Sequence, residues 1–242
     1  MKISSLIGSF ARNFLPPKIY FKFYRFVKRS RLKVGAGSFV HDTVQIIGQS
    51  NVAIDRNVVI GESGWFNVNH REVGKSAILI GDNCFFGRRS FLSSGDKIQF
   101  GEYCLTAADC RFLGSSHEIS DPSMPYVTTG TTRGDSIVIG HKLFFGYGSV
   151  VLGNVTIGSG SVIGAGALIL EDVPSFSMVV GNPGKVVRRY SFSQKAWIPI
   201  GILCPSDLDE NPSDVAFLAM LRRRGGTPSL PIIAAGSDMG NL

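Results

Sequence analysis

Four histidines are the side chains of this 242-residue chain best suited to moving a proton near neutral pH. His117 has the most distinctive setting, because it lies in residues 114–125, a stretch rich in Ser, Asp and Pro. A neutral imidazole can remove the proton of a hydroxyl while that hydroxyl attacks an electrophile. The other three, His41, His70 and His141, complete no His-x4-His pair, so the spacing predicts no zinc site.

A six-residue repeat surrounds this stretch and indicates how the chain positions it. An aliphatic residue or Phe recurs every six residues without error at Ile139, Phe145, Val151, Ile157, Ile163 and Ile169. The same period runs from Ile80 to Ile98, resumes at Phe100 after a slip of two residues, and leaves weaker traces over 34–60. The period is lost between Phe112 and Ile139, and loops that leave a repeat structure often carry function.

A second set of residues, four after each aliphatic, is small or compact. Its members are Cys84, Ser90, Cys104, Cys110, Ser149, Val155, Ser161 and Ala167. Three of the four cysteines belong to this set, so we interpret them as buried small hydrophobes and not as ligands or nucleophiles. The cysteines form no Cys-x-x-Cys pair, and we recognise no secretion signal, which together favour a reducing compartment.

A six-residue period fits a short strand followed by a tight turn, since neither 3.5 nor 3.6 divides it. One large and one small inward residue per unit would fill a narrow triangular interior. A single unit cannot bury its own inner face, so the units must stack. We therefore predict a mainly β coil whose body runs from about Val34 to Pro174.

The charge is concentrated at one end of the chain. The first 33 residues contain nine Lys or Arg and no acidic residue, whereas the remainder has 16 basic and 18 acidic side chains. The net charge of +7 is therefore a property of this segment, which argues against a nucleic-acid-binding body. Tyr20, Phe23, Tyr24 and Val27 share one helical face. Residues 18–33 are thus expected to lie on an anionic membrane surface or to cap the coil, and the two roles are compatible.

The terminal repeats carry a resemblance. The six-residue units from Ile139, the exit 171–174 (Glu-Asp-Val-Pro) and the tail 180–188 (Val-Gly-Asn-Pro-Gly-Lys-Val-Val-Arg) resemble the hexapeptide-repeat acyltransferases, sugar O-acetyltransferase type, over about 78–189. The resemblance implies a left-handed parallel β-helix with short N-terminal and C-terminal helices. The corresponding organisation is a basic aromatic segment 1–33, a β-helix 34–189 with an inserted loop 114–136, and an extension 190–242 with a short helix and a mobile tail.

The same resemblance implies a function. An acetyl group would move from acetyl-CoA, without a metal, to a hydroxyl of a sugar or surface-glycan precursor, with His117 as general base. The expected assembly is a homotrimer with active sites between subunits. The expected setting is polysaccharide biosynthesis in the cytoplasm, at the inner membrane face if residues 18–33 bind there, with no nucleic-acid partner.

Supporting residues also follow from the resemblance. Asp109 matches a position where some relatives carry Asn, and it is a candidate to orient His117 or to bind a substrate hydroxyl, although an ordinary turn residue fits equally well. Glu118 and Asp121 are alternatives, and Pro122 makes Asp121 a plausible turn former. Relatives acting on galactosides have an Asn one coil earlier, whereas residues 86–89 here contain none.

Acetyl-CoA is assigned to the outer surface of the terminal coils. The residues implied for it are Phe144, Gly146, Tyr147, Ala165, Lys185 and Arg188. The small residues Gly146 and Ala165 would let pantetheine lie against the backbone, or they simply permit a tight coil. Leu170 and Glu171 replace the Thr-Lys of many relatives, and Arg189 is a candidate to compensate for that lost cation.

Three other functions are compatible with parts of the sequence. A zinc enzyme of the γ-carbonic anhydrase type shares the coil but needs three converging histidines. An N-acetyltransferase acting on an amino sugar often carries an additional nucleotide-binding domain in front. A non-catalytic scaffold would bind no coenzyme A and would be insensitive to replacement of His117.

Overall fold

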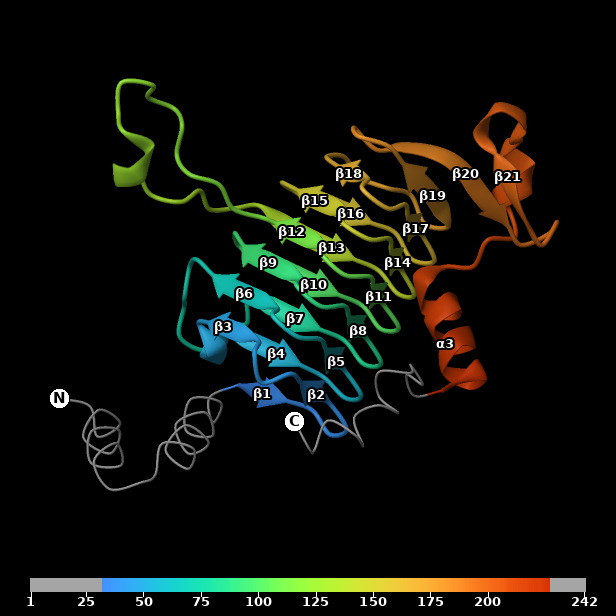
Figure 1. Ribbon diagram of the computed structural model, residues 1–242. Coiled ribbons are helices and arrows are strands. Elements are labelled where there is room, and N and C mark those ends of the chain that lie inside the picture. The colour runs from blue at the N-terminus through green and yellow to red at the C-terminus, as the bar shows by residue number, and fades with distance from the viewer. Residues whose placement is uncertain (1–31, 227–242) are drawn as a thin grey trace.

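A computed structural model describes residues 32–226, and its body is a triangular coil built from three parallel sheets (Figure 1). Sheet A contains β1 (Lys33–Val34), β4 (Val52–Ile54), β7 (Ile78–Ile80), β10 (Lys97–Phe100), β13 (Ser136–Ile139) and β16 (Val155–Ile157). Sheet C contains β3 (Gln45–Ile47), β6 (Trp65–Val68), β9 (Phe91–Ser94), β12 (Arg111–Leu113), β15 (Val150–Leu152) and β18 (Leu168–Ile169).

Sheet B is the longest of the three. Its parallel part contains β2 (Phe39–Val40), β5 (Val59–Ile60), β8 (Phe85–Phe86), β11 (Leu105–Thr106), β14 (Phe144–Phe145), β17 (Val162–Ile163) and β19 (Ser177–Val180). The chain visits sheets A, B and C in turn, and each strand pairs with its counterpart in the next coil. The predicted left-handed parallel β-helix is confirmed.

The three corners of the coil differ in how much chain they hold. Within every coil, the inward residues of sheets A, B and C are six residues apart, as the sequence predicted. Extra residues are confined to the corner where sheet C returns to sheet A, which we call the C–A corner. That return takes six residues from Val151 to Ile157, and its two longest forms span positions 66–80 and 112–139.

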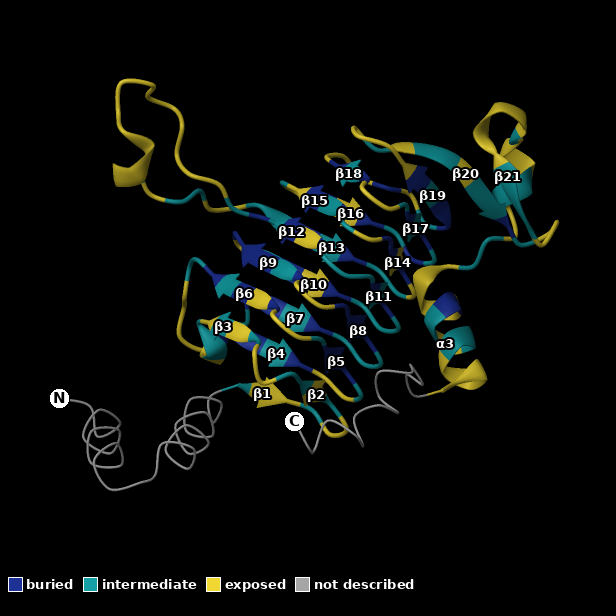
Figure 2. Cartoon of the chain, viewed as in Figure 1, coloured by how far each residue is buried: buried dark blue, intermediate teal, exposed yellow. Residues whose placement is uncertain are grey.

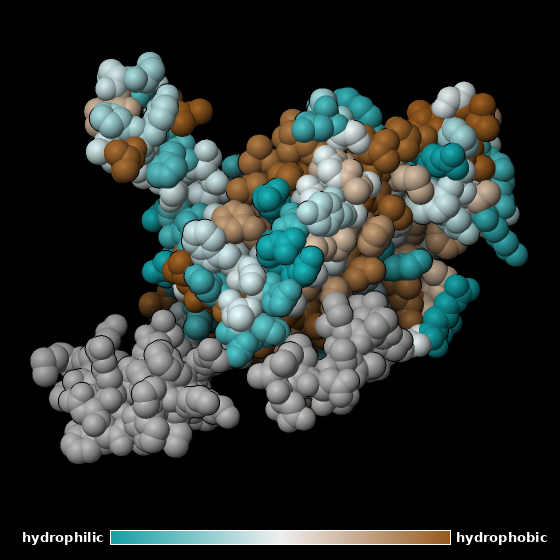
Figure 3. All heavy atoms as spheres, in the orientation of Figure 1, coloured by the Kyte–Doolittle hydropathy of each residue, from teal (hydrophilic) through white to brown (hydrophobic). Residues whose placement is uncertain are grey.

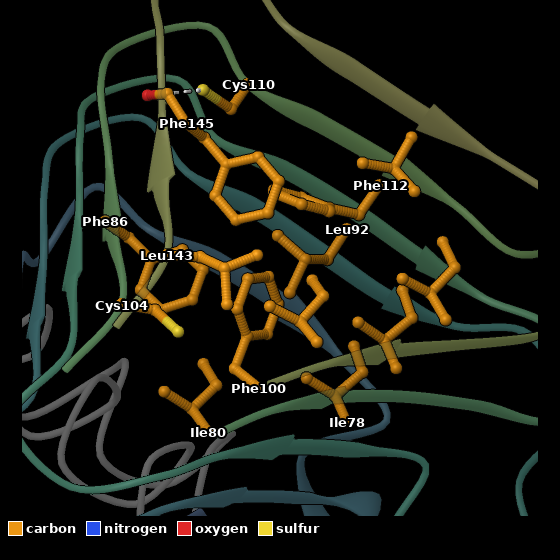
Figure 4. Packing of buried hydrophobic residues seen from close by; sticks show 14 of the residues in the cluster. Ile78, Ile80, Phe86, Leu92, Phe100, Cys104, Cys110, Phe112, Leu143 and Phe145 are labelled. Carbon is orange, nitrogen blue, oxygen red and sulfur yellow. Dashed lines mark hydrogen bonds between the residues drawn. The ribbon is translucent and has the colours of Figure 1, made fainter. Parts of the chain in front are cut away.

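Phenylalanines fill the middle of the coil (Figure 4). Phe100 packs edge to face on Phe86 and on Phe112, with ring centroids 4.8 Å apart in both pairs. Thr106 lies between Phe86 and Phe145 in the same row of sheet B, and it is fully buried. This smaller side chain leaves room for the two rings of its own coil, since a packed interior tolerates little excess volume.

The small residues of the repeat line the same interior, and all but Val155 lie one residue before a strand. Figure 2 draws the buried residues of the coil in dark blue. All eight of the small positions identified in the sequence, Cys84, Ser90, Cys104, Cys110, Ser149, Val155, Ser161 and Ala167, are at most 1 % exposed. Burial raises the pKa of the Cys84 and Cys110 thiols. The interpretation of these cysteines as inert packing residues agrees with that burial.

The coil closes with antiparallel strands. After β19, the chain reverses into β20 (Lys185–Ser191), which pairs with β19 and with β21 (Ala196–Pro199). The expected boundary between residues 189 and 190 is therefore displaced, because it falls inside β20. The tail motif 180–188 signalled the turn into this strand but not its pairing with β21.

One α-helix follows within the described residues, α3 (Asp214–Arg224), where a short C-terminal helix was expected. The Ser213 hydroxyl caps it by accepting a hydrogen bond from the Ala216 amide, and Gly225 ends it. Phe217 is 2 % exposed and packs on Phe176 with centroids 4.9 Å apart. The helix thus covers the corner between sheets A and B, and Arg222 forms an ion pair with Glu102 there.

Four short 3-10 turns complete the described part of the chain, at Gln49–Asn51, Tyr126–Thr128, Ile200–Ile202 and Pro205–Leu208. The aromatic helix expected before residue 32 and the tail expected after 226 lie outside it. Among the helices that are described, none is both long and apolar enough to cross a bilayer.

Candidate active site

His117 lies at the base of an arm, residues 114–135, that leaves the C–A corner between β12 and β13 (Figure 1). The two sides of the arm form a short antiparallel ribbon, in which His117 is paired with Thr131. The Glu118 amide donates to the Gly130 carbonyl at 2.9 Å, and the Thr132 amide donates to the Ser116 carbonyl at 2.7 Å. The backbone of His117 is therefore fixed on both sides, while its side chain is exposed.

The two acidic residues on the arm have different surroundings. Asp121 accepts hydrogen bonds from the Ser123 amide (2.9 Å) and hydroxyl (2.6 Å), which lower the pKa of its carboxyl. This is the turn-forming arrangement that Pro122 favours. Glu118 is exposed, and its amide belongs to the ribbon. Asp121 thus has a local structural task, and Glu118 is the acidic neighbour directly after His117.

Asp109 lies at a different corner from the arm, in the turn between sheets B and C, with φ of 62°. Its carboxylate accepts two hydrogen bonds from the Arg89 guanidinium, at 2.7 and 2.6 Å. Arg89, together with the Tyr147 hydroxyl, holds the pKa of the Asp109 carboxyl below its usual value. The sequence did not reveal this arginine partner, which occupies the same turn one coil earlier.

Four of the residues expected near acetyl-CoA come together beside Asp109. Phe144 is 41 % exposed on the outer face of β14, and Tyr147 is 60 % exposed in the following turn. A Cβ atom on Gly146 would lie 2.5 Å from the amide nitrogen of Ala165 in the next coil. Only glycine therefore fits at 146, which supports the tight-coil explanation for that residue. Ala165 itself is exposed.

The basic residues of the tail lie on the same face of sheet B. Phe144, Val162, Met178 and Arg188 are aligned across β14, β17, β19 and β20. At about 4.8 Å per strand, Arg188 is roughly 14 Å from Phe144. Lys185 and Arg188 are both exposed.

Arg189 has a different environment from these two cations. It donates from Nη2 to the Ser175 carbonyl at 3.0 Å, and burial lowers its pKa. This guanidinium is therefore engaged with the protein, so it is poorly suited to replace the cation missing at Glu171.

His117 and the expected acetyl-CoA residues are separated within one chain. The arm leaves the C–A corner, whereas Gly146, Tyr147 and Asp109 lie at the corner between sheets B and C. A hollow at Thr43, Gln45 and Ser63–Trp65 contains none of these residues. Over residues 32–226, no three His, Cys, Asp or Glu side chains are placed to hold a metal ion.

Comparison with known proteins places the coil among transferases. Residues 136–171 match the model of the bacterial transferase hexapeptide family, six repeats. A probable acetyltransferase of Mycobacterium tuberculosis is 26 % identical over 70 % of this chain and 54 % of its own length. A putative acetyltransferase of Staphylococcus aureus is 34 % identical over 46 % of this chain and 55 % of its own. The chain thus spans about half the length of these curated relatives.

A solved structure has the same fold. A point mutant of an N-acyltransferase from Bacillus cereus, in complex with dTDP and coenzyme A, aligns with a TM-score of 0.54. The alignment covers 65 % of this chain and 83 % of that one, at 19 % identity. The repeat, the three-sheet coil and the match over residues 136–171 together show that the coil is built from hexapeptide repeats of the bacterial transferase type.

Proposed function

We propose that the protein is an acetyl-CoA-dependent O-acetyltransferase acting on a hydroxyl of a sugar or surface-glycan precursor. The observation that carries the proposal is His117, an exposed imidazole whose backbone is fixed in the ribbon of the arm. The similarity to acetyltransferases over up to 70 % of the chain supports the donor.

His117 acts as general base in this proposal. Its neutral imidazole takes the proton of the acceptor hydroxyl as the oxygen attacks the thioester carbonyl of acetyl-CoA. A tetrahedral oxyanion forms and collapses, the carbon–sulfur bond breaks, and the coenzyme A sulfur receives the proton from the imidazolium. The products are the acetyl ester and free coenzyme A, and no acyl-enzyme is required.

Acetyl-CoA lies along the outer face of sheet B in this proposal. The exposed ring of Phe144 and the small exposed side chain of Ala165 offer an apolar path for pantetheine, and the buried Gly146 lets the two coils approach closely beneath it. Lys185 and Arg188 supply positive charge for the phosphates at the far end of the row. Asp109 is retained by Arg89, so its proposed part is to position Tyr147 beside this path rather than to orient His117.

We also propose a homotrimer, which the resemblance implies and which the separation of the two halves of the site within one chain supports. His117 on one chain would face the acetyl-CoA residues of a neighbouring chain, because the arm extends away from its own coil. The arm exposes Ile119, Met124, Tyr126 and Val127, between 48 and 88 % each. Figure 3 shows apolar residues on this arm, where a second subunit would cover them. A closed three-fold ring satisfies all three arms equally.

The direct test is release of free coenzyme A from acetyl-CoA in the presence of a panel of sugars. Replacement of His117 by Ala should lower the rate by roughly 10²–10⁴-fold while leaving the assembly mass unchanged. Sugars with a free amine are included, and acetylation of the amine alone would replace O-transfer by N-transfer. A rate unaffected by His117→Ala would remove this residue from the mechanism, and absence of coenzyme A binding would favour a scaffold.

The membrane proposal for residues 18–33 is tested separately. Co-sedimentation of the full-length protein with anionic vesicles should be lost at high salt if the basic residues bind the lipid headgroups. Absence of any sedimentation would leave only the capping role for this segment.

A further inference from the structure

His70 belongs to the other long insertion at the C–A corner, which lies two coils before the arm. Its Nε2 atom is 2.9 Å from the Thr132 carbonyl oxygen and 3.3 Å from the Thr131 hydroxyl. A carbonyl oxygen can only accept, so Nε2 must carry a hydrogen and donate it. His70 therefore fastens the returning side of the arm to the body of the coil.

Thr132 is the residue on which the base of the arm is assembled. Its carbonyl accepts from His70 and also from the Ser115 hydroxyl, at 3.3 Å. Its hydroxyl accepts from the Ser116 amide at 3.1 Å, and its own amide donates to the Ser116 carbonyl. The contacts with Ser115 and Ser116 tie the outgoing side of the arm to the returning side.

Thr131 lies between His70 and His117, because its hydroxyl contacts the His70 ring and its backbone is paired with His117. His117 and Thr131 are flanked by two ribbon hydrogen bonds and share none between themselves, which makes them a non-hydrogen-bonded antiparallel pair. In such a pair the Cα atoms are about 4.5 Å apart and the side chains are neighbours on one face. One residue thus separates the His70 imidazole from the His117 imidazole.

The insertion that carries His70 is itself held in place. The Asn69 side-chain Nδ2 donates to the Ser93 hydroxyl and the Ser94 carbonyl of the intervening coil, both at 3.0 Å. The Asn67 side chain donates to Asn69. The Gly114 amide at the start of the arm donates to the Ser93 carbonyl at 2.9 Å, so three successive returns at this corner, 66–80, 92–100 and 112–139, are connected. His70 is part of a supported element and not of a free loop.

We infer that His70 is a positioning residue for His117. The inference rests on the proposed role of His117 as base, and it assigns to His70 the task of fixing the arm's base. The contact with Thr132 requires only that Nε2 of His70 carries a hydrogen. Glu72, Lys75 and Asp96 line the pocket beside His70, where Lys75 and Asp96 are paired at 2.8 Å.

The first measurement follows the arm and needs no substrate. Hydrogen exchange of the full-length protein should show faster exchange at Ser116, Glu118 and Thr132 in His70→Ala, and near-native exchange in His70→Gln, whose amide can donate in the same place. His141→Ala is the matched control, because His141 also bonds a backbone group, the Glu102 amide at 2.9 Å, but at another corner. Unchanged protection of the arm in His70→Ala would overturn the inference.

The second measurement uses acetyl transfer. His70→Ala should lower kcat on the order of tenfold or more, since small misplacement of a catalytic group is costly, and leave KM for acetyl-CoA unchanged. His70→Gln should recover most of kcat. In a His117→Ala background, His70→Ala should have no further effect, and an undiminished further loss would overturn the inference. If no acceptor is acetylated at all, the proposed function fails, while the exchange experiment still decides what His70 does.

Discussion

Asp109 and Arg188 show how differently individual residues of the site relate to the sequence. Asp109 stood out as a possible partner of His117, but its actual partner is Arg89, one coil earlier in the same turn. Arg188 matched a motif in a continuous stretch, and the structure places it on the outer face of sheet B, in one row with Phe144. A motif within one continuous stretch therefore predicts where a residue such as Arg188 lies. An ion pair between two coils, such as Arg89–Asp109, depends on which turns lie above one another, and the sequence does not state that.

The Arg89–Asp109 pair gives a testable pH dependence. The lowered pKa of Asp109 means that its ionised form stabilises the folded state at neutral pH, and this contribution is lost as pH falls through the lowered value. We expect Asp109→Asn, which tolerates the positive φ, to lower Tm at pH 7. The difference in Tm between this variant and the wild type should shrink at pH values below 3.8, the ordinary pKa of an aspartate. Thermal scans across pH measure it, and a constant difference at all pH values would contradict the assignment.

Arg188 allows the coenzyme A assignment to be tested on one side chain. Arg188→Ala should raise KM for acetyl-CoA several-fold with little change in kcat, since it removes an attraction that does not differ between ground and transition states. Arg223→Ala on α3 is the control, because it deletes an exposed arginine elsewhere. Steady-state kinetics with varied acetyl-CoA would reject the assignment if both variants behaved alike.

At the scale of elements, the repeat predicted the strands well and the corners poorly. The six-residue period and the small positions follow from the need to fill a narrow triangle, and both are read directly from residue types. The pairing of β20 with β21 and the contact of His70 with Thr132 join segments that follow no period. The spacing of inward residues does show that 66–80 and 112–139 are both returns to sheet A. That places both insertions at the same corner, where His70 contacts Thr132.

The phenylalanine stack makes a quantitative prediction for the coil. Phe100 is 2 % exposed and contacts rings on both sides, so Phe100→Ala should lower the free energy of unfolding by about 3–5 kcal/mol. Val73, which is fully exposed, is the matched control, and Val73→Ala should stay within about 0.5 kcal/mol. Denaturant titrations compare the two, and a loss below about 1 kcal/mol for Phe100→Ala would contradict this packing.

At the scale of the whole molecule, the arm is the feature that a single chain leaves incomplete. Its apolar residues are exposed, and among the described residues none of those proposed to bind acetyl-CoA lies at the corner that carries the His117 imidazole. The arm, residues 114–135, is also separate in sequence from the basic N-terminal segment 1–33. Assembly and catalysis are therefore expected to depend on the same insertion.

Val127 provides the test of assembly. Val127 is 88 % exposed on the arm, and Val127→Asp would place an unpaired charge in the proposed interface. We expect the trimer fraction and the transfer rate to fall together, by roughly tenfold or more, as measured by light scattering and coenzyme A release. Val215→Asp on α3, a position 82 % exposed, should change neither. A stable Val127→Asp trimer would show that the arm is not the contact.

Confining every insertion to one corner makes the coil a modular scaffold. A peptide grafted in place of residues 115–134 enters and leaves at fixed points, so the hydrogen-bond ladders of β12 with β15 and of β10 with β13 keep their register. Lengthening or exchanging that peptide changes the surface that the protein presents at this corner. The cost in stability is small, since the entropy lost on closing a loop rises slowly with loop length. A chain built in this way can therefore change the surface that it presents at one corner without redesigning the core.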